Sequence, residues 1–196
     1  MKTGIFTLSA IVTLVLLQSF TLNVPTNVPT LVETISVTSS KVVWKGYKVT
    51  GSHEGTIDLK SGSLNFTDDK LSGGEFVIDM ASLTATDLEG EYKDKLNGHL
   101  LSDDFFGAAT FPTSTLVITD VKAVSKNAYA VTGDLTIKGI TKSVEFDASV
   151  YGKKATANLK VDRTLFNVKY GSGSYFDGLA DNLIYDEIDL VIDLAF

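Results

Sequence analysis

YAVTGDLTIKGITKSVEFDASV, residues 129–150, contains two runs in which apolar and polar side chains alternate. Apolar residues recur at every second position of each run, interrupted only by Gly133 in the first. Strict alternation is typical of strands that bury one face and expose the other to water. Such strands form antiparallel sheets, because strands of parallel sheets are usually buried on both faces. The stretch therefore predicts strands of an antiparallel sheet.

The same period of two extends over most of the chain from residue 31 onward. It recurs in residues 56–60, 64–66, 76–80 and 187–196. Short connections rich in glycine, polar or charged residues separate the runs, and they are residues 61–63, 67–70, 125–127 and 151–154. About eight strands at this hairpin spacing predict an all-β fold, either an up-and-down barrel or a sandwich.

One segment between the strands has a helical pattern instead. Thr86–Glu89 has the form of a capping box, which begins a helix by satisfying free backbone N–H groups. The apolar positions that follow are spaced as on one helix face, and they are Leu88, Tyr92, Leu96, His99 and Leu100. Ser102 can cap a second short turn that carries Phe105 and Phe106. We expect this short helical insert to cap one end of a barrel.

Composition excludes several classes of protein. The chain has 196 residues, a formal net charge of −7 and no cysteine. An acidic surface repels a phosphate backbone, so nucleic acid is not expected as a partner. Without cysteine there is no disulfide, no thiolate catalysis and no thiolate-bound metal, and two histidines do not suggest a His-rich metal site. We therefore expect no cofactor and no metal ion.

The first thirty residues differ from the rest. Lys2 precedes an apolar run over residues 5–17, and this layout is typical of a secretory signal peptide. We expect residues 1–21 to be a signal peptide or an uncleaved anchor, which would be the only membrane contact. Residues 22–30 predict an extended linker, and residues 31–196 a single domain. The protein is then exported, to the periplasm or the extracellular space.

The apolar side chains allow two interpretations of the barrel interior. Either they fill a solid core, or they line a tunnel, since eight strands enclose just enough room for one slender ligand. The candidates for a tunnel lining are large apolar residues of the alternating strands and the helical insert: Trp44, Tyr47, Phe66, Phe76, Ile78, Met80, Leu96, Phe105, Phe106, Phe111, Tyr129 and Phe146.

Three polar residues are candidates for a ligand headgroup or for chemistry. His53 and His99 are the two histidines, and Arg163 is the single arginine. A lone guanidinium suits bidentate pairing, either with Asp186 or Glu187 inside the fold or with a ligand headgroup. The histidines could serve as an acid–base pair only if both reach one cleft. No catalytic motif accompanies them, so no catalytic residue is assigned.

Four motifs, in order along residues 35–196, resemble those of the YceI-like, polyisoprenoid-binding family. They are Gly55–Ile57, Leu101–Phe106 with Thr110–Thr113, Val131–Lys142, and Arg163–Val168. Gly107 and Asn167 stand where that family usually has Asp and Gly. The resemblance implies an exported, lipocalin-like barrel of eight antiparallel strands that encloses a long isoprenoid chain, of quinone or polyprenyl type.

We therefore expect a lipid-binding protein and not an enzyme. Two alternatives stay open: a structural or interaction domain with a filled core, and an enzyme that uses His53 and His99. Nothing in the sequence excludes a homodimer.

Overall fold

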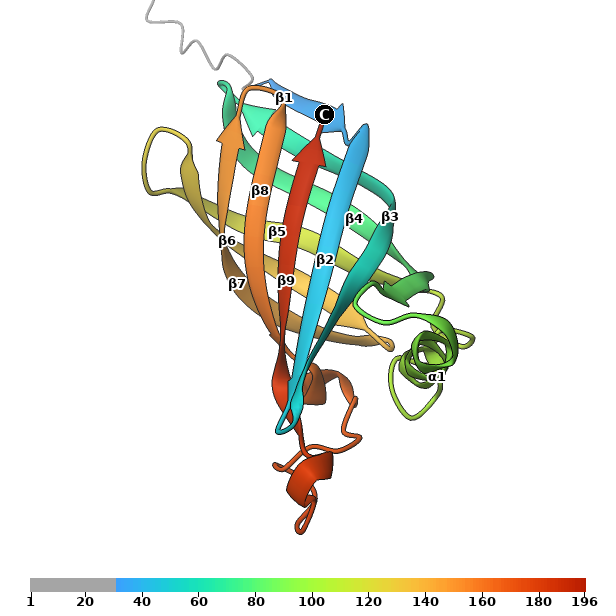
Figure 1. Ribbon diagram of the computed structural model, residues 1–196. Coiled ribbons are helices and arrows are strands. Elements are labelled where there is room, and N and C mark those ends of the chain that lie inside the picture. The colour runs from blue at the N-terminus through green and yellow to red at the C-terminus, as the bar shows by residue number, and fades with distance from the viewer. Residues whose placement is uncertain (1–30) are drawn as a thin grey trace, which may run out of the picture.

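The computed structural model describes residues 31–196, so the predictions for residues 1–21 and 22–30 lie outside the described residues. Figure 1 shows strands wrapped around a common axis, with one helix beside them. The elements, in chain order, are β1 (Val32–Ser36), β2 (Ser39–Lys48), β3 (Gly51–Thr67), β4 (Lys70–Ala85), α1 (Gly90–Leu101), β5 (Thr113–Ala123), β6 (Ala128–Ile137), β7 (Ile140–Tyr151), β8 (Lys154–Asp162), η1 (Arg163–Phe166), η2 (Ala180–Asn182) and β9 (Ile184–Ala195).

Strands β2 to β9 close into an eight-stranded antiparallel barrel, which confirms the predicted fold and excludes the sandwich. The order around the barrel is β3-β2-β9-β8-β7-β6-β5-β4, and β4 pairs again with β3. The short strand β1 is an addition. It pairs with the last residues of β3, with Val32 opposite Thr67, whereas β2 pairs with the first residues of β3. β1 therefore pairs with the part of the β3 edge that β2 does not reach.

Three of the four predicted connections are confirmed, and one is wrong. Residues 67–70, 125–127 and 151–154 join consecutive strands. Residues 61–63, in contrast, lie inside β3, where its register against β4 shifts between Leu59 and Ser61. A Cβ atom on Gly62 would lie 2.7 Å from Cδ1 of Phe76. Glycine there lets a long strand bend against a bulky neighbour, and this role is indistinguishable from a turn in sequence.

The inward face of the strands follows the predicted alternation. Val131 and Leu135 of β6 are buried. Leu159 and Val161 of β8, which lies outside the predicted runs, are buried in the same way. Gly55 of β3 serves a close approach between strands, because a Cβ atom there would overlap the carbonyl oxygen of Thr84 and lie 2.6 Å from Cζ2 of Trp44. The Gly55–Ile57 motif thus allows β2, β3 and β4 to pack closely around the indole.

The predicted helix is confirmed, but the predictions of its first residue and of its apolar face are partly wrong. α1 begins after Glu89, with no side-chain cap, and the backbone N–H of Thr86 instead donates to the carbonyl oxygen of Glu54. Tyr92, expected on the apolar face, is 75% exposed. The side-chain amide of Asn97 attaches the helix to the end of β4. Its oxygen accepts a hydrogen bond from the backbone N–H of Ala85, and its nitrogen donates one to the hydroxyl of Thr84. Tertiary bonds to β3 and β4 therefore replace the capping box.

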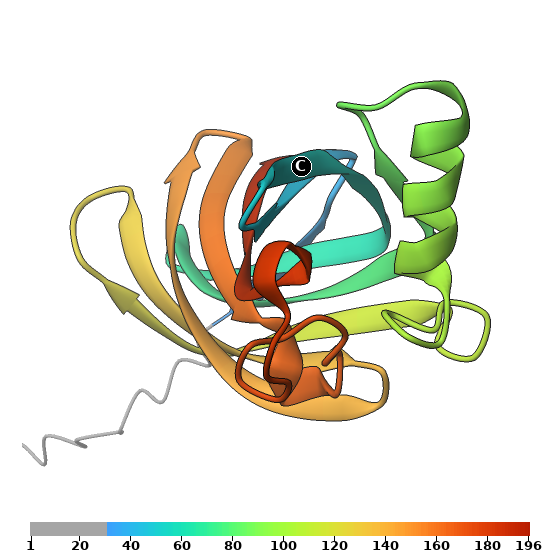
Figure 2. The same ribbon diagram turned by 60° about the horizontal axis from the view of Figure 1, so that its bottom comes forward.

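α1 and residues 163–183 lie at the same end of the barrel, as Figure 2 shows from that side. No helix within residues 31–196 combines the length and the apolar character needed to cross a membrane.

Candidate functional site: a tunnel along the barrel

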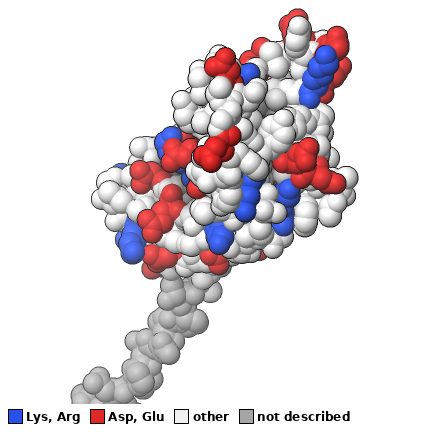
Figure 3. Space-filling view, turned by 90° about the horizontal axis from the view of Figure 1, so that it is seen from below, with Lys and Arg blue, Asp and Glu red and all other residues white. Residues whose placement is uncertain are grey.

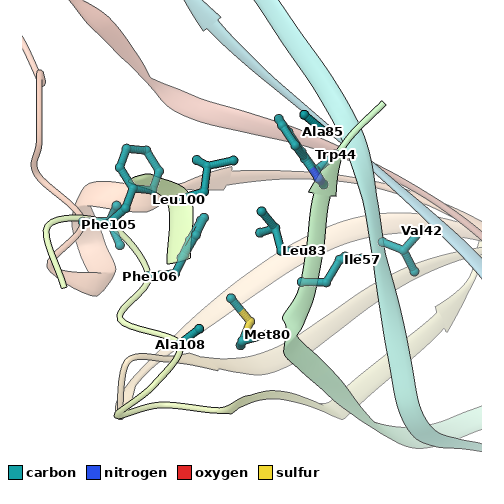
Figure 4. Close-up of a cluster of buried hydrophobic side chains, with 11 residues drawn as sticks. Val42, Trp44, Ile57, Met80, Leu83, Ala85, Leu100, Phe105, Phe106 and Ala108 are labelled. Atoms are coloured by element: carbon teal, nitrogen blue, oxygen red, sulfur yellow. The ribbon is translucent and has the colours of Figure 1, made fainter. Parts of the chain in front are cut away.

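The barrel is hollow. A cavity of about 380 Å³ lies at the end that carries α1, and a second of about 110 Å³ lies deeper. A single water needs only about 10–15 Å³ on this measure, so the larger space can accept an organic ligand. These cavities contradict the filled-core alternative. Figure 4 shows the buried apolar cluster at this end, contributed by β2, β3, β4, α1 and the turn after α1.

The two cavities adjoin. Four side chains line both of them, and we call these four the waist: Val42, Ile78, Leu135 and Leu190. They come from β2, β4, β6 and β9, and so from all around the barrel. The two spaces therefore meet at the waist, and we call the two adjoining cavities together the tunnel.

The polarity of the tunnel changes along its length. The large cavity is bordered by the exposed residues Lys48, Tyr170, Asp181, Asn182 and Tyr185, which mark its opening to solvent, the mouth. Every side chain around the deep cavity is apolar except Thr156. Beyond it the aromatic rings of Phe66 and Phe196 pack 5.5 Å apart. The tunnel thus has a polar mouth and an apolar deep part.

The candidate lining residues fall into three groups. Lining the large cavity, or both, are Trp44, Tyr47, Ile78, Met80, Leu96, Phe105 and Phe106. Phe76 and Phe146 line the deep cavity. Phe66, Phe111 and Tyr129 line neither. Phe66 and Tyr129 pack in the core beyond the deep cavity, and Phe111 packs beside Gly107 and Gly139.

Arg163 is almost fully buried, at 1% exposure. It follows β8, in η1, where the Asp162 carboxylate caps the turn by accepting from the backbone N–H of Thr164. Its guanidinium donates three hydrogen bonds to carbonyl oxygens, from Nη1 to Val168 (2.7 Å), from Nη2 to Ile184 (3.0 Å) and from Nε to Tyr185 (3.2 Å).

The expected carboxylate pairing of Arg163 is only a secondary contact. Nη2 lies 3.6 Å from Oδ1 of Asp186, and Glu187 pairs with Lys160 instead. Burial lowers the pKa of the Arg163 guanidinium, and Asp186 and Asp162 oppose this. Arg163 also lines the large cavity, with its guanidinium carbon 5.4 Å from the centre of the Phe105 ring. It therefore ties η1 to the start of β9 and forms part of the tunnel wall.

The backbone conformation explains why asparagine can stand at position 167, where the family usually has glycine. Asn167 ends η1 with φ of 60°, in the left-handed region that glycine adopts freely and asparagine tolerates. Its backbone N–H donates to the carbonyl oxygen of Thr164. The departure from glycine at this position is conservative for the backbone.

The two histidines have separate partners. Nδ1 of His53 lies 2.9 Å from Oδ2 of Asp87. His99 packs edge-on against the rings of Tyr170 (4.4 Å) and Phe105 (5.5 Å). Both line the large cavity, but among the residues described no hydrogen bond joins them. The residues described also contain no cluster of three or more metal-binding side chains. Both histidines therefore reach the same cavity, but each contacts different groups there.

The His53–Asp87 pair should make stability depend on pH. Burial raises the pKa of Asp87, but the hydrogen bonds from His53 and from backbone N–H groups outweigh it and lower the pKa below 3.8. The contribution of Asp87 to the free energy of unfolding is then complete above about pH 4 and is lost as the pH falls through the lower folded-state pKa. For a partly exposed pair it is about 0.2–1 kcal/mol.

This dependence is measured as the difference in unfolding free energy between wild type and Asp87→Asn across pH. The difference should shrink as the pH falls below about 4, and it should be smaller in a His53→Gln background. A difference that does not vary with pH would contradict the assignment.

Sequence reasoning missed Lys138. From the β6–β7 turn its ammonium donates to the carbonyl oxygens of Phe105 (2.7 Å) and Asp103 (3.0 Å). This holds the turn that places Phe105 and Phe106 at the tunnel. Many apolar wall residues were missed too, such as Leu116, Leu159 and Ile188. The alternation of apolar and polar residues could have identified these wall residues, but the prediction favoured large aromatic side chains.

Comparison with known proteins agrees with this architecture. A sequence model of the YceI-like domain family matches residues 34–196. Over 99 residues the chain is 33% identical to the protein YceI of Escherichia coli O157:H7, and over 92 residues it is 33% identical to a UPF0312 protein of Shewanella denitrificans. These matches cover 50% and 47% of this chain and 49% and 46% of the relatives, so the chain spans about half the length of the curated relatives it matches.

Two solved structures share the fold. BcnA of Burkholderia cenocepacia is 26% identical, with a TM-score of 0.64 over 80% of this chain and 96% of that one. A polyisoprenoid binding domain from Saccharophagus degradans, implicated in plant cell wall breakdown, has a TM-score of 0.54 over 82% of this chain and 97% of that one. It is 16% identical, so the likeness concerns the fold alone.

Proposed function

Because this chain belongs to the YceI-like domain family, we propose that its barrel binds one long-chain isoprenoid lipid, of quinone or polyprenyl type. The observation that carries the proposal is the tunnel, which is open at a polar mouth and apolar along its depth. The name of the Saccharophagus degradans domain, a polyisoprenoid binding domain of the same fold, supports the same ligand class.

The two ends of the tunnel suit the two ends of such a lipid. We place the tail in the deep cavity and the headgroup near the mouth, beside His53, His99 and Arg163. A buried isoprene unit contributes about 3–4 kcal/mol by transfer from water, at roughly 0.8 kcal/mol per carbon group. Association and ordering offset much of this sum, but affinity needs no strong polar contact.

Trp44 supplies the test, because it is the single tryptophan and lines the large cavity. Purified protein is stripped of lipid with organic solvent, refolded and titrated with an isoprenoid quinone, whose ring quenches indole emission. We expect saturable quenching at one quinone per chain, and an isoprenoid in the solvent extract. Quenching that rises without saturation, together with an extract free of lipid, would refute the proposal.

We also propose that the protein is exported, to the periplasm or the extracellular space. The support is the sequence of residues 1–21, with one early positive charge and an apolar run. Deleting these residues should leave the protein in the cytoplasm with an unchanged melting temperature, because no barrel strand is removed. Cell fractionation and thermal unfolding check this, and export of the shortened chain would contradict it.

A further inference from the structure

We propose that the mouth of the barrel docks on a lipid bilayer through four aromatic side chains, which we call the rim: Tyr170, Tyr175, Phe176 and Tyr185. This inference rests on the proposed lipid ligand, and it adds a membrane contact to the one expected from the N-terminal segment. Lipids of this class are poorly soluble in water, so a protein that binds them must meet the membrane that holds them.

The rim is an exposed apolar surface joined to the tunnel. Each of its four side chains is between 48% and 52% exposed. Tyr170 and Tyr185 also line the large cavity, so the rim continues into the tunnel wall. Aromatic side chains gather at membrane interfaces, where the ring meets acyl chains and polar atoms meet water. A lipid leaving the bilayer there would pass directly between rim and mouth.

The loop that carries the rim is ordered by its own hydrogen bonds. The backbone N–H groups of Tyr175 and Phe176 both donate to the carbonyl oxygen of Ser172. Ser172 is fully buried, and the hydroxyl of Ser174 donates to the Asp186 carboxylate (2.6 Å). The two rings are thus held outward by a fixed backbone. Their exposure is built into the loop, and little ordering entropy is lost when they enter a membrane.

The charges near the rim favour a neutral bilayer surface. Asp177 and Asp181 are exposed beside it, Lys169 lies 4.2 Å from the centre of the Tyr175 ring, and Lys48 is exposed at the mouth. Figure 3 looks onto this end, where acidic and basic side chains both lie among uncharged ones. Anionic lipids attract surfaces with clustered Lys and Arg, which this segment lacks. The partner is therefore a zwitterionic bilayer, bound by insertion of the rim.

The first experiment reads contact at one position of the full chain. Phe176→Trp is compared with Tyr151→Trp, each with wild-type emission subtracted, on phosphatidylcholine vesicles whose acyl chains are brominated. Tyr151 is the matched control, because it is 62% exposed and lies at the other end of the barrel, beside the end of β9. We expect bromine to quench only the Phe176→Trp signal. Equal quenching of both variants, or none of either, would overturn the proposal.

The second experiment measures transfer. A quinone-loaded donor vesicle is mixed with wild type, with the double variant Tyr175→Ser and Phe176→Ser, or with Tyr151→Ser, and Trp44 quenching follows uptake. We expect the double variant to take up quinone at least about tenfold more slowly, with Tyr151→Ser unchanged. Uptake that is equally fast in all three, or that depends on added phosphatidylglycerol and not on the rim, would overturn the proposal.

A third arm separates this proposal from the proposed function. Quinone delivered from dilute ethanol, without vesicles, should bind the double variant and wild type equally. If neither protein binds it while the Phe176→Trp signal is still quenched by brominated vesicles, the docking surface stands and the ligand assignment fails.

Discussion

Replacing Arg163 by leucine is expected to lower the free energy of unfolding by about 3–5 kcal/mol, because buried partners would be left without a cation. Three carbonyl oxygens, of Val168, Ile184 and Tyr185, would each lose a donor, at roughly 1–3 kcal/mol for an unsatisfied buried group. The Asp186 carboxylate, 3.6 Å away, would lose its counter-charge. Urea unfolding followed by Trp44 emission measures the change.

Two further variants keep this prediction testable if the leucine variant does not fold. Arg163→Lys retains the charge but cannot reach three carbonyls that lie in different directions, so it should cost about 1–3 kcal/mol. Lys160→Met removes an exposed cation from Asp189 and Glu187 and should cost much less. If Arg163→Lys were as stable as wild type but bound quinone weakly, the residue would serve the ligand headgroup instead.

Replacing Ile78 by tryptophan should weaken binding of a long isoprenoid more than about tenfold while the protein stays folded. Ile78 belongs to the waist, and an indole there would extend into the space between the cavities. Overpacking costs about 1–3 kcal/mol where no room exists, but here the added atoms enter an open tunnel. Quinone titration and thermal unfolding of the same sample check both parts of the prediction.

Chain length and position supply the controls. A short isoprenoid that fits the large cavity alone should still bind Ile78→Trp, whereas one that extends past the waist should not. Val117→Trp places the same indole at a β5 position that is 45% exposed and lines neither cavity, and it should leave binding unchanged. A strongly destabilised Ile78→Trp protein, together with a wild type that binds no quinone, would contradict the lipid-binding proposal.

Many strands of the barrel could be predicted because the pattern that identifies a strand lies within a few consecutive residues. Residues 129–150 form β6 and β7 as expected, since alternation identifies the two faces of a strand without knowledge of its partners. The wrong prediction of a connection at residues 61–63 has the same origin, because glycine occurs both in turns and at close approaches inside a strand. Only the position of Phe76, on the neighbouring strand, shows which of the two applies.

The sequence of this protein by itself determined the all-β class, the location of many of the strands and the apolar character of one face of each. These follow from the period of side chains along the chain and from short antiparallel connections. Only the tertiary structure decided that the interior is hollow, that Arg163 binds backbone carbonyls, and that Tyr170 and Tyr185 lie half-exposed at the edge of the large cavity. The physical reason is that a cavity, a buried donor's partners and an exposed surface depend on contacts between residues far apart in sequence, which no local pattern encodes.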